Sequence, residues 1–174
     1  MKNLITLFGI LLLVISSHAQ PVGYNYGKDI EIYSTEISGA TDLIDFTILV
    51  SITDIDLKSV ANGGHVESDL GHDIIFTADD CSIMLDHQLE SYDPLTGELV
   101  AWVRIPALSP VFDTNIHLYY GNSEIVSDLS TSDTWDSSYE GIWHMNNDPS
   151  TETLLDYSGN DRHECRSDQE RSRL

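Results

Sequence analysis

The chain has 174 residues, of which 8 are Lys or Arg and 29 are Asp or Glu, so its formal net charge is −21 at pH 7. A surface this acidic repels nucleic acid phosphates and anionic lipid headgroups, which excludes nucleic acid as a partner. The charge fits an exported protein in salty surroundings, or one that holds divalent cations with carboxylates, and both alternatives stay open.

Residues 1–19 form the first predicted element, a signal peptide. Lys2 precedes an apolar run over residues 4–15, and the small residues Ser17 and Ala19 stand just before the expected cleavage point. The run of about a dozen residues is shorter than the roughly 20 that a membrane-spanning helix needs. We therefore expect cleavage after Ala19, a secreted or cell-surface location and no transmembrane segment in the mature chain; the alternative is an uncleaved anchor.

The middle of the chain alternates short β-rich runs with turn residues, which is typical of an all-β sandwich. Apolar side chains stand at every second position of several runs, as a half-buried strand requires. In chain order these runs contain Ile30 and Ile32; Phe46, Ile48, Val50 and Ile52; residues 74–76; Leu99, Ala101, Val103 and Ile105; and Ile116, Leu118 and Tyr120. We predict an antiparallel, jelly-roll-like β-sandwich over residues 20–122.

Turn residues support this prediction. Pro94 and Gly97 lie between two runs and predict a hairpin over residues 92–99, because Pro favours the second turn position and Gly accepts a positive φ. One helical turn is expected over residues 54–61, capped by Asp54 or Asp56. Residues 123–138 are rich in Ser, Thr and Asp, which indicates a linker.

Four motifs occur in order within residues 72–122: DIIFT at 73–77, LDHQLESYD at 85–93, GELVAWV at 97–103 and LYYGN at 118–122. Together they resemble the extracellular module catalogued as domain of unknown function 2341, and the resemblance extends back to Tyr24. It implies a fold and an exported setting. The family has no established activity that could be carried over to this chain.

The sequence after the linker resembles a different module. Residues 134–147 and 155–164 are similar to the opening of a laminin-G or concanavalin A-like lectin domain, so residues 139–163 are expected to form an incomplete second β-domain. Glu164 stands where that resemblance implies Gly. Residues 164–174 are expected to be disordered, as the product of a reading-frame slip or premature end, or as a short basic tail.

The sequence contains no motif that indicates catalysis. Acidic pairs such as Asp86 with Glu90, or Glu90 with Glu98, could serve a glycosidase only if held about 5–10 Å apart, and nothing distinguishes them from solvated acids. The seven histidines lack the spacing of a zinc site. We therefore predict that the chain is not an enzyme.

Candidate sites for a cation are few. Asp79 and Asp80 could hold calcium with loop carbonyls, although both are also ordinary turn residues. No other cofactor is predicted. Cys81 and Cys165 could pair in an oxidising compartment, but we favour Cys81 as an isolated thiol.

A ligand-binding surface is predicted on the outer face of the sandwich. If Leu99 and its alternate neighbours point inward, Trp102 and Arg104 point outward, and His117 and Tyr119 do so on the following strand. Aromatic rings beside polar groups can stack on and hydrogen-bond a sugar. The alternative is that a second layer buries Trp102 as part of a core.

These inferences predict a non-catalytic module of a secreted or cell-surface multidomain protein. Its expected role is adhesion or carbohydrate association, with an extracellular carbohydrate or a surface protein as partner. The alternatives are a fragment of a polysaccharide-degrading enzyme and a purely structural spacer domain.

Overall fold

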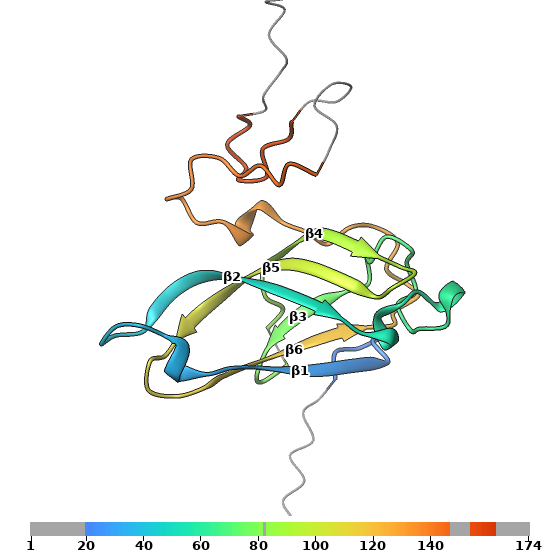
Figure 1. Ribbon diagram of the computed structural model, residues 1–174, viewed down its shortest axis with the longest axis horizontal. Helices are drawn as coiled ribbons and strands as arrows, with labels where there is room; N and C mark the ends of the chain where they lie inside the picture. Colours follow the sequence, from blue (N-terminus) through green and yellow to red (C-terminus); the bar gives the residue numbers. More distant parts are fainter. Residues whose placement is uncertain (1–19, 82, 147–153, 163–174) are drawn as a thin grey trace, which may run out of the picture.

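A computed structural model describes residues 20–81, 83–146 and 154–162 of the chain. In these residues six strands form two antiparallel sheets that face each other, which confirms the predicted all-β sandwich (Figure 1). Sheet A has the order β1-β6-β3 and sheet B the order β2-β5-β4. The strands are β1 (Tyr26–Ile32), β2 (Leu43–Thr53), β3 (Ile75–Ala78), β4 (His87–Asp93), β5 (Glu98–Leu108) and β6 (Thr114–Tyr120).

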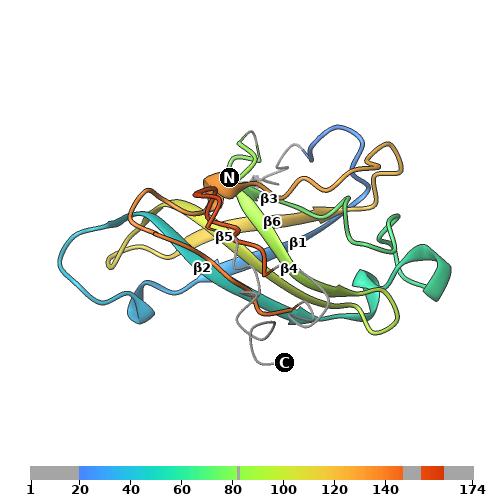
Figure 2. The ribbon, with the colours of Figure 1, turned by 90° about the horizontal axis from the view of Figure 1, so that it is seen from above.

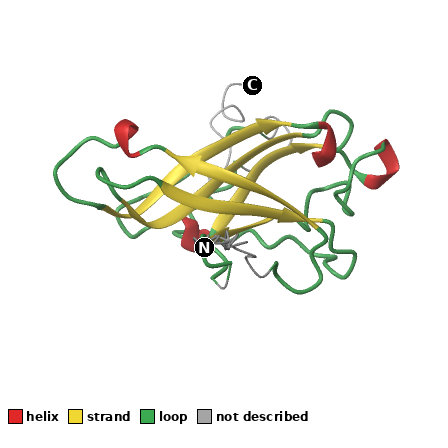
Figure 3. Ribbon diagram, turned by 90° about the horizontal axis from the view of Figure 1, so that it is seen from below, coloured by secondary structure: helices red, strands yellow, loops and turns green. Residues whose placement is uncertain are grey.

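The only helices among the described residues are short 3-10 turns in the loops (Figure 3). The helical turn predicted over residues 54–61 is present as two of them, η2 and η3. None of the described helices is long and apolar enough to cross a membrane. The four turns are η1 (Ser34–Glu36), η2 (Ile55–Leu57), η3 (Val60–Asn62) and η4 (Ser132–Thr134).

The core lies between the two sheets, and strand β5 shows why. Its alternate residues Leu99, Ala101, Val103 and Ile105 are all buried, as predicted, because successive side chains of a strand point to opposite faces. Strand β6 adds Ile116, Leu118 and Tyr120 from the other sheet, and Ile74 and Phe76 join them, whereas the buried Ile75 packs in a separate cluster with Cys81 and Tyr119. The predicted hairpin joins β4 to β5.

Strand β2 is less buried at one end than the sequence predicts. Val50 is buried, but Phe46 is 46% exposed, although it stays opposite the buried Ile105 of β5. Strand β2 is an edge strand, and Asp45 next to Phe46 has a left-handed backbone (φ 53). Thr47 is buried and donates a hydrogen bond to the carbonyl of Thr134 (2.7 Å).

Asp73 ties the loop before β3 to the end of β6. Its fully buried carboxylate accepts hydrogen bonds from the backbone amides of Glu67, Ser68 and Gly121, each at 2.9 Å, and from Asn122 at 3.3 Å. A buried carboxylate is stable only when its oxygens are satisfied in this way.

The chain after β6 crosses back over sheet B. Figures 1 and 2 show this segment, in orange to red, on the outer side of β4 and β5. It is attached through Thr131, whose amide donates to the carbonyl of His87 (2.9 Å), and through Ser130, whose hydroxyl accepts from the amide of Leu89 (3.0 Å). We call residues 129–146 and 154–162 the C-terminal segment.

The turn glycines allow a direct test of the β4–β5 hairpin. A Cβ on Gly97 (φ 74) would lie 2.0 Å from the carbonyl oxygen of Asp54, whereas a Cβ on Gly63 (φ 87) would meet no atom within 4 Å. We expect Gly63→Ala to lower the free energy of unfolding by about 1–2 kcal/mol, through backbone strain alone. Gly97→Ala should lower it by roughly 1–3 kcal/mol more, because the backbone must also move. Urea unfolding measures both, and equal losses would contradict the close packing of Gly97.

Candidate functional site

The outer face of sheet B carries a row of side chains at matching positions of its three strands. Trp102 on the central strand β5 is opposite Leu49 on β2 and Gln88 on β4. A register shift between Leu89 and Ser91 makes Glu90 the extra residue of a β-bulge. Such bulges redirect a side chain, and this one leaves the Glu90 carboxylate beside the indole of Trp102, whose Nε1 donates to Glu90 Oε2 (2.6 Å).

The C-terminal segment covers this row and encloses a hollow of about 580 Å³ above it. That size is within the range of small-molecule sites. Four of the lining side chains are aromatic, one is a carboxylate and one is an imidazole. The lining residues are Glu90, Trp102, Trp135, Tyr139, Gly141, Ile142, Trp143 and His144. We call this the aromatic hollow.

Gln88 holds the two halves of the hollow together. Its buried side-chain oxygen Oε1 accepts from Nε1 of Trp135 (2.9 Å) and lies 2.8 Å from Nε2 of His144. An indole nitrogen can only donate, so the atom facing Trp135 must be the amide oxygen. The same oxygen can accept from His144 only if Nε2 carries the proton. The neutral ring of His144 therefore has its lone pair on Nδ1.

The Nδ1 lone pair of His144 is an acceptor, and it faces another acceptor, the carboxylate of Glu90. Nδ1 of His144 lies 3.4 Å from Oε2 of Glu90. Burial lowers the pKa of His144 below its ordinary value of 6.5, although the charge of Glu90 acts in the opposite direction. His144 is therefore neutral at pH 7, and two acceptors stand side by side in the wall of the hollow.

The aromatic walls are held by ring contacts. Trp135 packs against Trp102 with the ring centroids 5.2 Å apart and against Tyr139 at 5.1 Å. Trp143 is half-buried and rests on Gly141, where an added Cβ would lie 2.3 Å from its ring. Only glycine permits this close approach.

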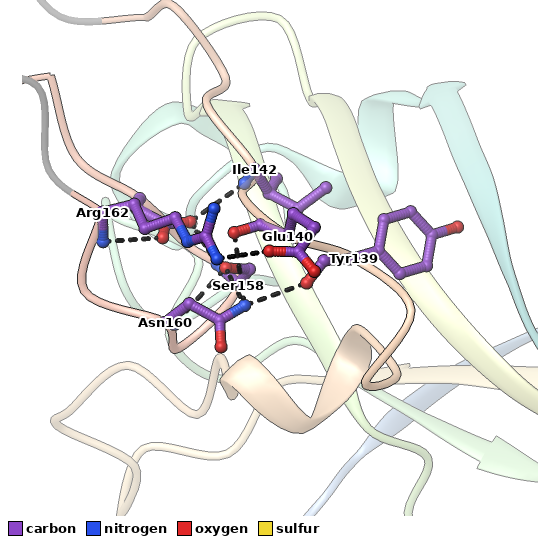
Figure 4. Close-up of polar contacts among 7 residues, drawn as sticks. Tyr139, Glu140, Ile142, Ser158, Asn160 and Arg162 are labelled. Atoms are coloured by element: carbon purple, nitrogen blue, oxygen red, sulfur yellow. Dashed lines mark hydrogen bonds and ion pairs between the residues drawn. The ribbon is translucent and has the colours of Figure 1, made fainter.

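Asp156 folds the C-terminal segment into a compact loop. Its carboxylate accepts from the amides of Ile142, Ser158 and Arg162, each at 2.9 Å. Burial raises the pKa of Asp156, but these hydrogen bonds lower it more, so the net pKa is well below the ordinary value of 3.8. Figure 4 shows the neighbouring contacts, in which Asn160 donates to the carbonyl of Tyr139 (2.9 Å) and Arg162 forms an ion pair with Glu140.

The structure brings only part of the predicted ligand-binding set together. Trp102 lines the aromatic hollow, half-buried beneath the C-terminal segment. Arg104 lies on the same face but donates to the carbonyl of Asp133 in the covering segment (2.9 Å) and forms an ion pair with Asp45 of β2 (3.3 Å).

His117 and Tyr119 lie on β6 in sheet A, so the sandwich separates them from Trp102 and Arg104. The prediction treated consecutive strands as neighbours in one sheet, whereas the chain crosses from sheet B to sheet A between β5 and β6. His117 Nδ1 is 2.7 Å from Asp29 Oδ1, and the hydroxyl of Tyr119 is 3.1 Å from the free, buried thiol of Cys81. Burial raises the pKa of Tyr119 to about 12.

The predicted calcium residues lie in the loop after β3. The carbonyl of Asp79 is 3.3 Å from His117 Nε2, and the side chain of Asp79 is 65% exposed. Asp80 is next to it, exposed. Within the residues that the structure describes, no group of three or more His, Cys, Asp or Glu side chains could hold a metal ion. Cys165, the predicted signal peptide over residues 1–19 and the tail over residues 164–174 lie outside the described residues.

Several residues of the hollow escaped prediction. Trp135, Tyr139, Trp143 and His144 were assigned to a linker and to the opening of a second domain, and Gln88 was not singled out. One signal was available, because residues 134–144 contain two of the three tryptophans of the chain. Among the acids suggested as pairs, Glu90 alone lines the hollow.

Two other hollows occur in the described residues, and their linings offer fewer aromatic side chains for a ligand. One of about 420 Å³ lies along β1 and β2 and has a mainly aliphatic lining. Another, of about 350 Å³, lies at one end of the sandwich between Ile105 and Ile116. Neither contains a tryptophan, so the aromatic hollow is the strongest candidate for a binding site.

Comparison with known proteins identifies the family to which the chain belongs. The family described as Domain of unknown function (DUF2341) matches residues 70–156, half of the 174-residue chain. The match extends beyond residue 122 and includes every residue that lines the aromatic hollow. No curated protein and no solved structure matches the chain.

The neutral state of His144 predicts a pH effect on stability. Because its pKa is lowered on folding from 6.5, the unfolded chain binds a proton that the folded chain does not, so its contribution is complete above pH 6.5 and is lost progressively as the pH falls from this value to the lower pKa of the folded state. We expect His144→Gln, which keeps a donor for Gln88, to lose less stability than the unchanged protein between pH about 7 and about 5. Urea midpoints of both proteins measure the difference. A variant that is equally or more acid-sensitive would contradict a neutral His144.

The loop formed by Asp156 can be opened selectively. Asp156→Asn replaces one acceptor oxygen by a donor that faces backbone amides, and we expect a local loss of about 1–3 kcal/mol. Hydrogen exchange of the amides of Ile142 and Ser158 should accelerate, while exchange in β5 stays unchanged. Asp42→Asn, an exposed acid before β2 with the same change of charge, is the control. Unchanged exchange at Ile142 would show that Asp156 does not hold this loop.

Proposed function

The chain belongs to the DUF2341 family, and we propose that it is a non-catalytic module of a secreted or cell-surface protein that binds carbohydrate in the aromatic hollow. Association with an extracellular glycan is the means by which such a module serves adhesion. The single observation that carries the proposal is the joint position of Trp102, Trp135, Tyr139 and Trp143 around one carboxylate.

The chemistry of the lining supports a sugar. A pyranose ring has apolar C–H faces that stack on aromatic rings, and its rim of hydroxyls needs polar partners. Trp102 and Trp143 provide the aromatic surface, since both are only half-buried. Glu90 and His144 provide acceptors at 3.4 Å from each other for hydroxyl donors.

The same lining supports binding rather than hydrolysis. Glycoside hydrolysis uses two carboxyl groups across the bound sugar. Glu90 is the only acid among the described residues that line the hollow. One oxygen of its carboxylate already accepts from the Trp102 indole (2.6 Å).

Two sequence features support the setting. Residues 1–19 have the pattern of a signal peptide, which supports export. Residues 139–163 resemble the opening of a lectin-like domain, which supports a carbohydrate ligand. In this proposal the C-terminal segment is part of the binding site of the β-sandwich, because it forms most of the wall of the hollow.

Loss of the Trp143 platform tests the function. The chain is screened against immobilised glycans, and the affinity of any that bind is measured by titration calorimetry. We expect Trp143→Ala to weaken binding by about tenfold or more, because stacked aromatic residues dominate such interfaces. Thermal stability should change little, since the indole makes one polar contact, of 3.3 Å, to the carbonyl of Arg162.

Gly141→Ala is the second variant, since the added methyl displaces the Trp143 ring without removing it. Binding should weaken while the sandwich stays folded. Phe112→Ala, at a residue 74% exposed on the β5–β6 loop, is the control and should bind normally. If no glycan binds, or if Trp143→Ala and Gly141→Ala bind as well as the unchanged chain, the hollow is not a sugar site and a spacer role is favoured. Turnover of a bound polysaccharide that Glu90→Gln abolishes would instead indicate an enzyme.

A further inference from the structure

We propose that the aromatic hollow selects a sugar with a free ammonium group, that is, an amino sugar, over neutral and anionic sugars. This selectivity rests on the proposed function, because it names the class of sugar for the same hollow. Three independent features of the described lining support it: its charge, its hydrogen-bonding groups and its aromatic rings.

The charge of the hollow is negative and uncompensated. Glu90 is the only charged side chain among the eight lining residues, and none of them is Lys or Arg. The guanidinium of Arg104, on the same face of sheet B, is engaged by the carboxylate of Asp45 (3.3 Å). His144 is neutral at pH 7 because burial lowers its pKa. A cationic ligand is therefore attracted, and a uronate or sulfated sugar is repelled.

Glu90 and His144 present only acceptors to the hollow. Gln88 fixes the proton of His144 on Nε2, so the Nδ1 lone pair and Glu90 Oε2 face each other at 3.4 Å. Among the described residues, Glu90 Oε1 accepts no hydrogen bond, since Trp102 uses Oε2. Two neighbouring acceptors are satisfied best by a group that only donates. An ammonium has three donors and no acceptor, whereas a hydroxyl or an acetamido group also brings an acceptor.

The aromatic rings favour a cation as well. A cation within about 6 Å of a ring face is attracted by the ring quadrupole, most strongly for tryptophan. Trp102, Trp135 and Trp143 line the hollow together with Tyr139. A ring of aromatic side chains closed by one carboxylate is a common way to recognise an ammonium group. The same rings also stack on the sugar to which the ammonium is attached.

The test compares three β-1,4-linked tetrasaccharides of equal length: glucosamine, N-acetylglucosamine and glucose. Affinities for the full chain are measured by titration calorimetry at pH about 6, which keeps the sugar amines protonated. We expect the glucosamine tetrasaccharide to bind about tenfold tighter than either of the others, since it adds a charge-assisted hydrogen bond and a cation–π contact.

Glu90→Gln separates charge from shape. The glutamine oxygen can take the place of Glu90 Oε2 and still accept from the Trp102 indole, so the hollow stays folded. We expect this variant to bind all three tetrasaccharides within about twofold of one another. Glu98→Gln makes the same change of charge at an exposed residue outside the hollow, on the neighbouring strand, and should keep the preference. It controls for general attraction of a cation to a chain of net charge −21.

The outcomes distinguish the inference from the function on which it rests. If the three tetrasaccharides bind equally, and Trp143→Ala weakens all of them, the hollow is a sugar site without preference for an ammonium and the inference fails alone. A preference that is the same in Glu90→Gln and Glu98→Gln, and that disappears at about 0.5 M salt, is general electrostatics and also overturns it. If no carbohydrate binds the chain in this test or in the glycan screen, the proposed function fails and the inference with it.

Discussion

The aromatic hollow depends on one buried atom, the side-chain oxygen of Gln88. It accepts from the indole of Trp135 and lies within hydrogen-bond distance of His144, so it attaches the covering segment to sheet B at two points. A buried amide oxygen without partners is costly, and for this reason the segment and the sheet stabilise each other. Because an indole nitrogen can only donate, the first contact also determines the tautomer of His144 and therefore which atoms face a ligand.

The two sheets use their outer faces differently, although both contribute to one core. On sheet A, polar groups contact one another: His117 Nδ1 lies 2.7 Å from Asp29 Oδ1, and Cys81 Sγ lies 3.1 Å from the Tyr119 hydroxyl. On sheet B, a β-bulge directs Glu90 outward beside Trp102, and the covering segment leaves room above them. A bulge commonly re-aims a side chain at a functional site, and here it explains why one acid of many faces the hollow.

The covering segment belongs physically with the sandwich. Its residues Thr131, Trp135 and His144 all bond to β4, and the family match continues through it to residue 156. Some of its apolar side chains stay accessible, such as Met145 at 67% exposure, while Ile142 and Trp143 are half-buried. The segment packs on sheet B, and this packing creates the hollow.

Sequence alone determined the all-β architecture, the inner faces of β5 and β6 and the β4–β5 hairpin, because side-chain alternation and turn residues are local properties. It also identified Trp102 and Glu90 as residues of interest. Only the tertiary structure decided which outward residues meet. It separated His117 and Tyr119 from Trp102 through the crossover between sheets, left Phe46 partly exposed on the edge strand β2, and brought Trp135, Trp143 and His144 over β4. Contacts between residues far apart in the chain depend on strand order and on how loops pack, and neither is encoded in local periodicity.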